Sequence, residues 1–202
     1  MINYTNRGTA YKLISSNGPE IILVHGLGMN HKMWNWQIEE LSKKYKVIVY
    51  DLFGHGDSKD PEGDISLKLF SDQILELISS LNLNKVALIG FSLGGMIARR
   101  FAIDHPKKLW GLGILNSAHR RDNKARIMVQ KRVEQVKKFG PSVTVDDAIE
   151  RWFSKKFQNK NKQVINTVRS WVISNKTNIY SKIYQLLVDG VDELLDKTLP
   201  IS

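Results

Sequence analysis

The chain has 202 residues, of which 30 are lysine or arginine, 20 are aspartate or glutamate, and none is cysteine. A chain of this length can bury a core without a metal or a disulfide, and the lack of cysteine excludes disulfide-stapled and thiolate–metal folds. No apolar run approaches the roughly 18 residues of a membrane-spanning helix, and the first residues contain no signal-peptide core. The composition predicts a soluble, cytoplasmic globular protein without a membrane partner.

The net charge of +10 comes from one segment of the chain. Residues 107–162 hold 15 basic and 5 acidic side chains, whereas the segments before and after them are balanced. The basic residues alternate with apolar ones at helical spacing, and neither zinc ligands nor an RNA-binding aromatic run accompanies them. The charge indicates a solvated helix face or a surface that attracts a small anionic substrate, and we expect no nucleic-acid partner.

The first 117 residues alternate short apolar runs with amphipathic stretches, which is typical of parallel strands covered by helices. Residues 1–18 predict a leading antiparallel hairpin. The predicted core strands are Ile21–Val24, Val47–Tyr50, Val86–Phe91 and Leu112–Leu115. Apolar residues at steps of three and four predict two helices between them, marked by Trp34, Ile38, Leu41 and Tyr45 and by Leu67, Phe70, Ile74, Leu77 and Leu81.

From Ala118 onward the strand-like runs stop and helical periodicity takes over. Val129, Val133 and Val136 mark one helix, which Gly140-Pro141 closes. A second helix is capped by Asp146 or Asp147 and carries Ile149, Trp152, Phe153 and, near its end, Phe157; a third contains Ile165, Val168 and Val172, and a fourth Tyr180, Tyr184 and Leu187. We predict an α/β core over residues 1–117, a helical cap over 118–190, and the start of a return to the core over 191–202.

The most informative motif is Gly90-Phe91-Ser92-Leu93-Gly94-Gly95, between a predicted strand and a predicted helix. A serine on a sharp strand-to-helix turn needs glycine two residues before and after it, because a side chain there would collide with the neighbouring element. The N–H group of Leu93 then lies next to the serine and can stabilise an oxyanion. The motif predicts that Ser92 is a nucleophile, since a glycine-rich connection without chemistry would not need this arrangement.

A second motif, His25-Gly26-Leu27-Gly28, follows the first core strand. Its glycines let the backbone approach the serine turn, so the Leu27 N–H group is the natural second oxyanion donor. His25 at the base of this loop is interpreted as a structural residue that bonds to backbone, not as a catalytic base. A third motif spans residues 50–58, where we expect Asp51 to stabilise a tight turn and His55 to pack locally.

These three motifs, in this order and spacing, resemble the α/β-hydrolase superfamily in its form with a single helical cap. The resemblance implies an α/β fold with a mostly parallel sheet, Ser92 as nucleophile, Leu27 and Leu93 as oxyanion donors, and no cofactor or metal. More loosely, Met33-Trp34, residues 101–106 and cap residues 148–153 resemble 3-oxoadipate enol-lactonases. That resemblance implies a small anionic enol-lactone as a substrate.

The histidines depart from the family pattern, in which an acid and then a histidine follow the nucleophile along the chain. Histidine occurs only at positions 25, 31, 55, 105 and 119. His105 precedes a proline at a predicted helix end and suits a packing role, whereas His119 is a candidate substitute base that would break the order. Asn116 and Ser117 directly follow the last predicted strand, Leu112–Leu115, so its end offers no carboxylate.

Residues 199–202 resemble the approach to a further core strand, after which the family places its acid and histidine. We therefore expect a truncated sequence that lacks the last core strands, roughly 50 residues. The expected function is that of a serine hydrolase acting on an ester, lactone or related acyl bond of a small, carboxylate-bearing molecule, impaired in this form. The alternative is a non-catalytic ligand-binding protein on the same fold. The residues that select the substrate and the oligomeric state stay open.

Overall fold

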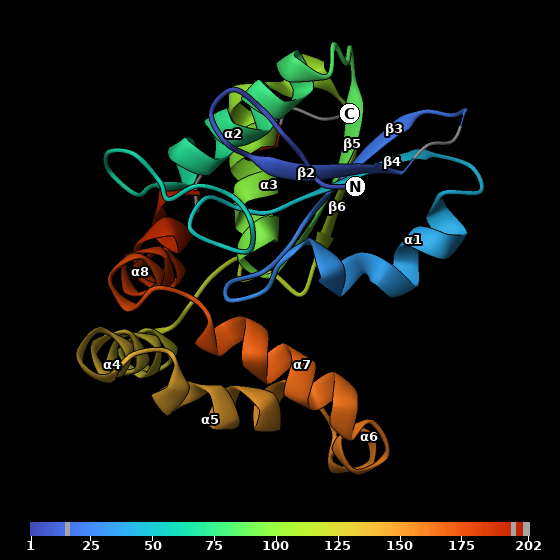
Figure 1. Cartoon of the computed structure of the whole chain (residues 1–202). Helices are drawn as coiled ribbons and strands as arrows, with labels where there is room; N and C mark the ends of the chain where they lie inside the picture. The colour runs from blue at the N-terminus through green and yellow to red at the C-terminus, as the bar shows by residue number, and fades with distance from the viewer. Residues whose placement is uncertain (15–16, 195–196, 200–202) are drawn as a thin grey trace.

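The computed structural model describes residues 1–14, 17–194 and 197–199, and within them a mostly parallel sheet forms the centre of the molecule (Figure 1). Its strands run in the order β1-β2-β4-β3-β5-β6. Their bounds are Asn3–Tyr4 for β1, Ala10–Ile14 for β2, Glu20–Val24 for β3, Lys46–Tyr50 for β4, Val86–Phe91 for β5 and Leu109–Leu115 for β6. Strands β3 to β6 are parallel, and β1 and β2 are antiparallel additions. The sheet confirms the predicted fold class and the leading hairpin.

The two faces of the sheet bury alternate residues of each strand, as the period of two requires. In β3, Ile22 and Val24 belong to the large core under helices α2 (Leu67–Ser80), α3 (Leu93–Asp104) and α8 (Thr177–Glu193). Ile21 and Leu23 belong to a smaller cluster with residues of α1 (Asn35–Leu41) on the other face. Because both faces are covered, the strands read as continuous apolar runs rather than as alternating ones.

The first two predicted helices are present. Ser66 caps α2 by accepting a hydrogen bond from the Leu69 N–H group. The other begins as a 3₁₀ turn, His31–Trp34, which Asn30 caps, and continues as α1. Helix α1 ends at Leu41, so the prediction that Tyr45 belongs to this helix is wrong.

Helices α4 (Asn123–Phe139), α5 (Ser142–Trp152), α6 (Lys155–Lys160) and α7 (Lys162–Ile173) lie together beyond one end of the sheet (Figure 1). The predicted cap at Asp146 or Asp147 is wrong, because α5 begins directly after Pro141, whose fixed φ suits a helix start. Phe153 has extended backbone, and Ser154 caps a separate helix, α6, which carries Phe157.

Helix α8 packs against α4 of this group and against α3 of the core (Figure 1). It continues past residue 190, where the cap was predicted to end, because Val191 and Leu194 are buried along with earlier residues of the helix. Of the predicted return to the core, residues 195–196 and 200–202 lie outside the described residues. No described helix is long and apolar enough to cross a bilayer.

Strand β6 pairs with β5 and with no other strand among the described residues. Its apolar residues Trp110, Ile114 and Leu115 are 45%, 37% and 44% exposed. An exposed apolar edge is a template for pairing between chains. We therefore expect the 202-residue chain to self-associate, with a mass by light scattering above 23.1 kDa.

Ile114→Lys should shift this association toward the monomer, because a charge on an edge strand opposes pairing. Ile127→Lys, on the exposed surface of α4, is the matched control and should leave it unchanged. A monomeric parent chain with a single cooperative melting transition would contradict the prediction.

Candidate active site

Ser92 occupies the sharp turn between β5 and α3. Its backbone angles, φ 54° and ψ −115°, are strained for a residue with a side chain. A Cβ atom on Gly90 would overlap the backbone of Gly94, and one on Gly94 would overlap the Val24 carbonyl oxygen. The glycines are therefore required by the close packing of this turn against α3 and the end of β3.

Backbone hydrogen bonds hold Ser92 in this conformation. Its N–H group donates to the Leu115 carbonyl oxygen at 2.9 Å, and its own carbonyl oxygen accepts from the Ser117 hydroxyl at 2.7 Å. The Ser92 hydroxyl itself has no hydrogen-bond partner among the described residues, and Ser92 lines a cavity. The hydroxyl is therefore free for chemistry.

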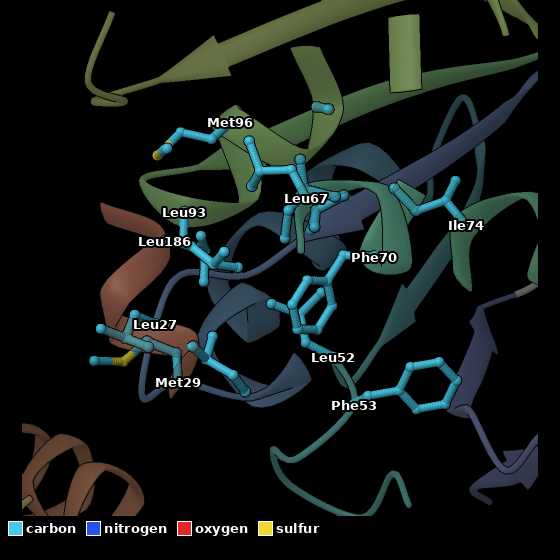
Figure 2. Packing of buried hydrophobic residues seen from close by; sticks show 14 of the residues in the cluster. Leu27, Met29, Leu52, Phe53, Leu67, Phe70, Ile74, Leu93, Met96 and Leu186 are labelled. Atoms are coloured by element: carbon cyan, nitrogen blue, oxygen red, sulfur yellow. The ribbon is translucent and has the colours of Figure 1, made fainter. Parts of the chain in front are cut away.

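The N–H groups of Leu27 and Leu93 donate no hydrogen bond to any described residue. The side chains of both residues are buried, and Figure 2 shows them in the same cluster as Leu186 of α8. Buried side chains fix the backbone that carries them, so both amides are held in place. Leu27 also lines the cavity, and Leu93 directly follows Ser92.

Two buried histidines hold the loop that carries Leu27. The Nε2 atom of His25 accepts from the Leu52 N–H group at 2.9 Å, so its Nδ1 carries the proton and donates to the Gly26 carbonyl oxygen at 2.8 Å. The Nε2 atom of His55 accepts from the Gly28 N–H group at 3.1 Å. Burial lowers the pKa of both rings, that of His55 to about 3. The structural roles predicted for both histidines are confirmed.

The Asp51 carboxylate stabilises the following turn, as predicted. It accepts from the His31 N–H group at 2.7 Å and from the Asp57 N–H group at 2.9 Å, and His31 Nδ1 lies 3.0 Å away. Burial alone would raise the pKa of Asp51, but the hydrogen bond from His31, the electrostatic interaction with the neighbouring histidines and the hydrogen bond from the Asp57 N–H group keep it below its usual value. These three side chains could hold a metal ion by their spacing, but the turn already accounts for their arrangement.

A cavity of about 750 Å³ lies above Ser92, between the core and the cap helices. Its lining includes three arginines, Arg121, Arg132 and Arg151, and the described part of the chain contributes no histidine, aspartate or glutamate to it. The sequence did not identify these cavity arginines individually, and the only signal was the positive charge of residues 107–162.

The histidines after Ser92 are not brought to this cavity. His119 is exposed and is not part of the lining. His105 ends α3, and its ring packs on Phe101 at 5.0 Å between centroids, in agreement with the predicted packing role. Among the described residues, the structure therefore shows no base beside Ser92.

Comparison with known proteins gives the family. Residues 19–163 match the family model of the α/β hydrolase fold. The chain is 30% identical over 189 residues to (E)-2-((N-methylformamido)methylene)succinate hydrolase of Acinetobacter baylyi, covering 94% of this chain and 70% of that protein. It is 32% identical over 168 residues to 3-oxoadipate enol-lactonase 1 of the same organism, covering 79% of this chain and 60% of that protein.

Solved structures are similar as well. The enol-lactonase from Burkholderia xenovorans superposes with a TM-score of 0.83 at 23% identity, over 93% of this chain and 73% of that one. A malate-bound esterase from Thermogutta terrifontis superposes with a TM-score of 0.78 at 25% identity, over 95% of this chain and 72% of that one. The serine on the sharp turn after β5, the mostly parallel sheet, the match to the family model and these relatives show that the chain belongs to the α/β-hydrolase family.

Proposed function

We propose that the chain carries the nucleophile and the oxyanion donors of a serine hydrolase that acts on an ester, lactone or related acyl bond of a small, carboxylate-bearing molecule. The observation that supports this most is the strained Ser92, whose unpartnered hydroxyl lies at the cavity beside two unpartnered N–H groups. A ligand-binding protein would not need a serine held in strained backbone.

The proposed chemistry starts with attack of Ser92 Oγ on the substrate carbonyl carbon, with the hydroxyl proton passing to a base. The carbonyl π electrons move to the oxygen, where the Leu27 and Leu93 N–H groups stabilise the negative charge. Collapse of this intermediate breaks the bond to the leaving oxygen, which takes the proton from the base and departs as the alcohol, leaving an acyl group on Ser92. Water then attacks the acyl carbon and gives a proton to the base, which returns it to Ser92 as the acid is released. No cofactor or metal enters these steps.

The substrate class rests on the cavity and on the relatives. Three arginines without a carboxylate in the lining favour an anionic molecule. The named substrates of two relatives, a methylenesuccinate and an enol-lactone of 3-oxoadipate, bear carboxylates, and the malate in the esterase does too. An enol-lactone is one substrate that fits this class.

The alternative function is non-catalytic binding of the same kind of ligand. It is favoured by the absence of histidine, aspartate and glutamate from the described cavity lining. An unassisted serine hydroxyl is a weak nucleophile, and loss of the base typically costs several orders of magnitude in rate. We therefore expect impaired turnover by the 202-residue chain.

A fluorophosphonate probe, which reacts with activated serines, tests the proposal. The samples are the 202-residue chain, its Ser92→Ala variant, and a version that includes any coding sequence downstream of residue 202. We expect labelling of the longer form, loss of the label in its Ser92→Ala variant, and labelling of the 202-residue chain at least about 100-fold slower. Ser170→Ala, on the exposed side of α7, is the control and should label normally.

The outcomes separate the two functions. Labelling of the 202-residue chain at Ser92 as fast as that of the longer form would support the nucleophile and indicate that a base lies within the shorter chain, and His119 would be the first histidine to replace. A label that persists in Ser92→Ala, or no label on any form, would overturn the proposal in favour of non-catalytic binding.

A further inference from the structure

Two of the cavity arginines are held by the same turn of α8. The Nε–H group of Arg121 donates to the Leu187 carbonyl oxygen at 2.9 Å, and the Nε–H group of Arg132 donates to the Tyr184 hydroxyl oxygen at 3.2 Å. Tyr184 and Leu187 are three residues apart, so they are neighbours on one face of the helix. The two guanidinium groups are therefore held side by side at the cavity.

The terminal nitrogens of both arginines have no hydrogen-bond or ion-pair partner among the described residues. Each guanidinium is anchored through Nε alone, which leaves its two NH₂ groups available for a ligand. The Tyr184 hydroxyl accepts from Arg132 and so keeps its own proton to donate. Tyr184 lines the cavity as well, so three side chains present donors to one region of it.

Their positive charge is not balanced within the cavity. No aspartate or glutamate among the described residues lines it, and the nearby Arg126 is already paired with Asp192. Partial burial lowers the pKa of Arg121, and the charges of Arg132 and Arg126 lower it further. Partly buried, like-charged groups without a counter-ion are unfavourable, and a bound anion relieves that cost.

We propose that Arg121, Arg132 and Tyr184 form a carboxylate-binding site that holds the acid end of the ligand, away from the bond that is cleaved. Two planar guanidinium groups match the two oxygens of a carboxylate, and the tyrosine hydroxyl adds a third donor. The exposed Arg151 on the rim attracts the anion without being fixed. That the bound molecule is a substrate cleaved at Ser92 rests on the proposed function. Binding of a carboxylate by these three side chains does not require the serine.

Intrinsic fluorescence measures binding directly, because Trp36, Trp152 and Trp171 line the same cavity. The probes are succinate and its neutral analogue succinamide, titrated at constant ionic strength into the 202-residue chain and into Ser92→Ala. We expect succinate to bind at least about tenfold more tightly than succinamide to both proteins. Equal affinity for the two probes would overturn the inference without any need for a variant.

Replacing single arginines tests whether the carboxylate binds to Arg121 and Arg132. Arg121→Gln and Arg132→Gln should each weaken succinate binding about tenfold and leave succinamide unchanged, with melting curves to confirm folding. Arg120→Gln is the matched control, because Arg120 is the exposed neighbour of Arg121 and does not line the cavity. An equal loss in Arg120→Gln would show a general charge effect and overturn the assignment.

The result is independent of the probe-labelling test. Preference for succinate without any labelling of Ser92 would keep the carboxylate site and remove the hydrolase function. Labelling without a preference for succinate would keep the hydrolase function and remove this site.

Discussion

The Gly94→Ala variant is expected to lose about 3–5 kcal/mol of unfolding free energy, the largest effect of any single methyl group that we predict. The added Cβ atom would overlap the Val24 carbonyl oxygen and lie 2.6 Å from that of His25. Val24 is the last residue of β3 and His25 directly follows it. Strand β3 has a strand on either side and is buried on both faces, so the backbone has little freedom to move away. Relief requires α3 to separate from the sheet, which disrupts the turn at Ser92.

Urea unfolding followed by circular dichroism measures this loss. Gly63→Ala is the control: Gly63 also has a positive φ, 77°, but no atom lies within 4 Å of an added Cβ. It should therefore show only the backbone cost of that φ, about 1 kcal/mol. Similar losses in the two variants would mean that close packing is not the reason for glycine at position 94.

Acid is expected to destabilise the fold well before its carboxylates are protonated. Burial holds the pKa of His55 at about 3, against 6.5 for an unperturbed histidine, and burial lowers that of His25 too. Below pH 6.5 the unfolded chain binds protons that the folded chain excludes, so stability is present above that pH and is lost as the pH falls toward 3. The slope is about 1.4 kcal/mol per pH unit for each such histidine.

The His55→Gln variant measures how much His55 alone contributes to this pH dependence of the unfolding free energy. A glutamine oxygen can accept the Gly28 hydrogen bond that His55 Nε2 accepts, but it does not titrate. Urea unfolding at pH 7 and pH 5 should therefore show a pH slope smaller by about one proton than in the parent chain. His119→Gln changes an exposed ring and should leave the slope as it was; an unchanged slope in His55→Gln would contradict the explanation.

The sequence by itself determined the core of this protein and the site of its candidate nucleophile. Continuous apolar runs such as Val86–Phe91 form buried parallel strands wherever helices cover both faces. The glycine pattern around Ser92 is equally short in the sequence: Gly90 is required by the backbone of Gly94 in the helix that directly follows, whereas Gly94 is required by the backbone at the end of β3. Short-range patterns therefore sufficed for these elements, while the catalytic role of Ser92, Leu27 and Leu93 stays a prediction.

Only the tertiary structure decided how the cap is divided and what it presents to the cavity. Helix α5 ends at Trp152 and the backbone is extended at Phe153, although the apolar spacing of the sequence continues through this position. Helix α8 extends to Glu193, past residue 190, and buries Val191. Arg121 and Arg132 read as ordinary members of a basic segment until α8, more than 50 residues later, supplies the partners that fix them. Such contacts depend on which helix faces pack together, and this is set by the whole core rather than by neighbouring residues.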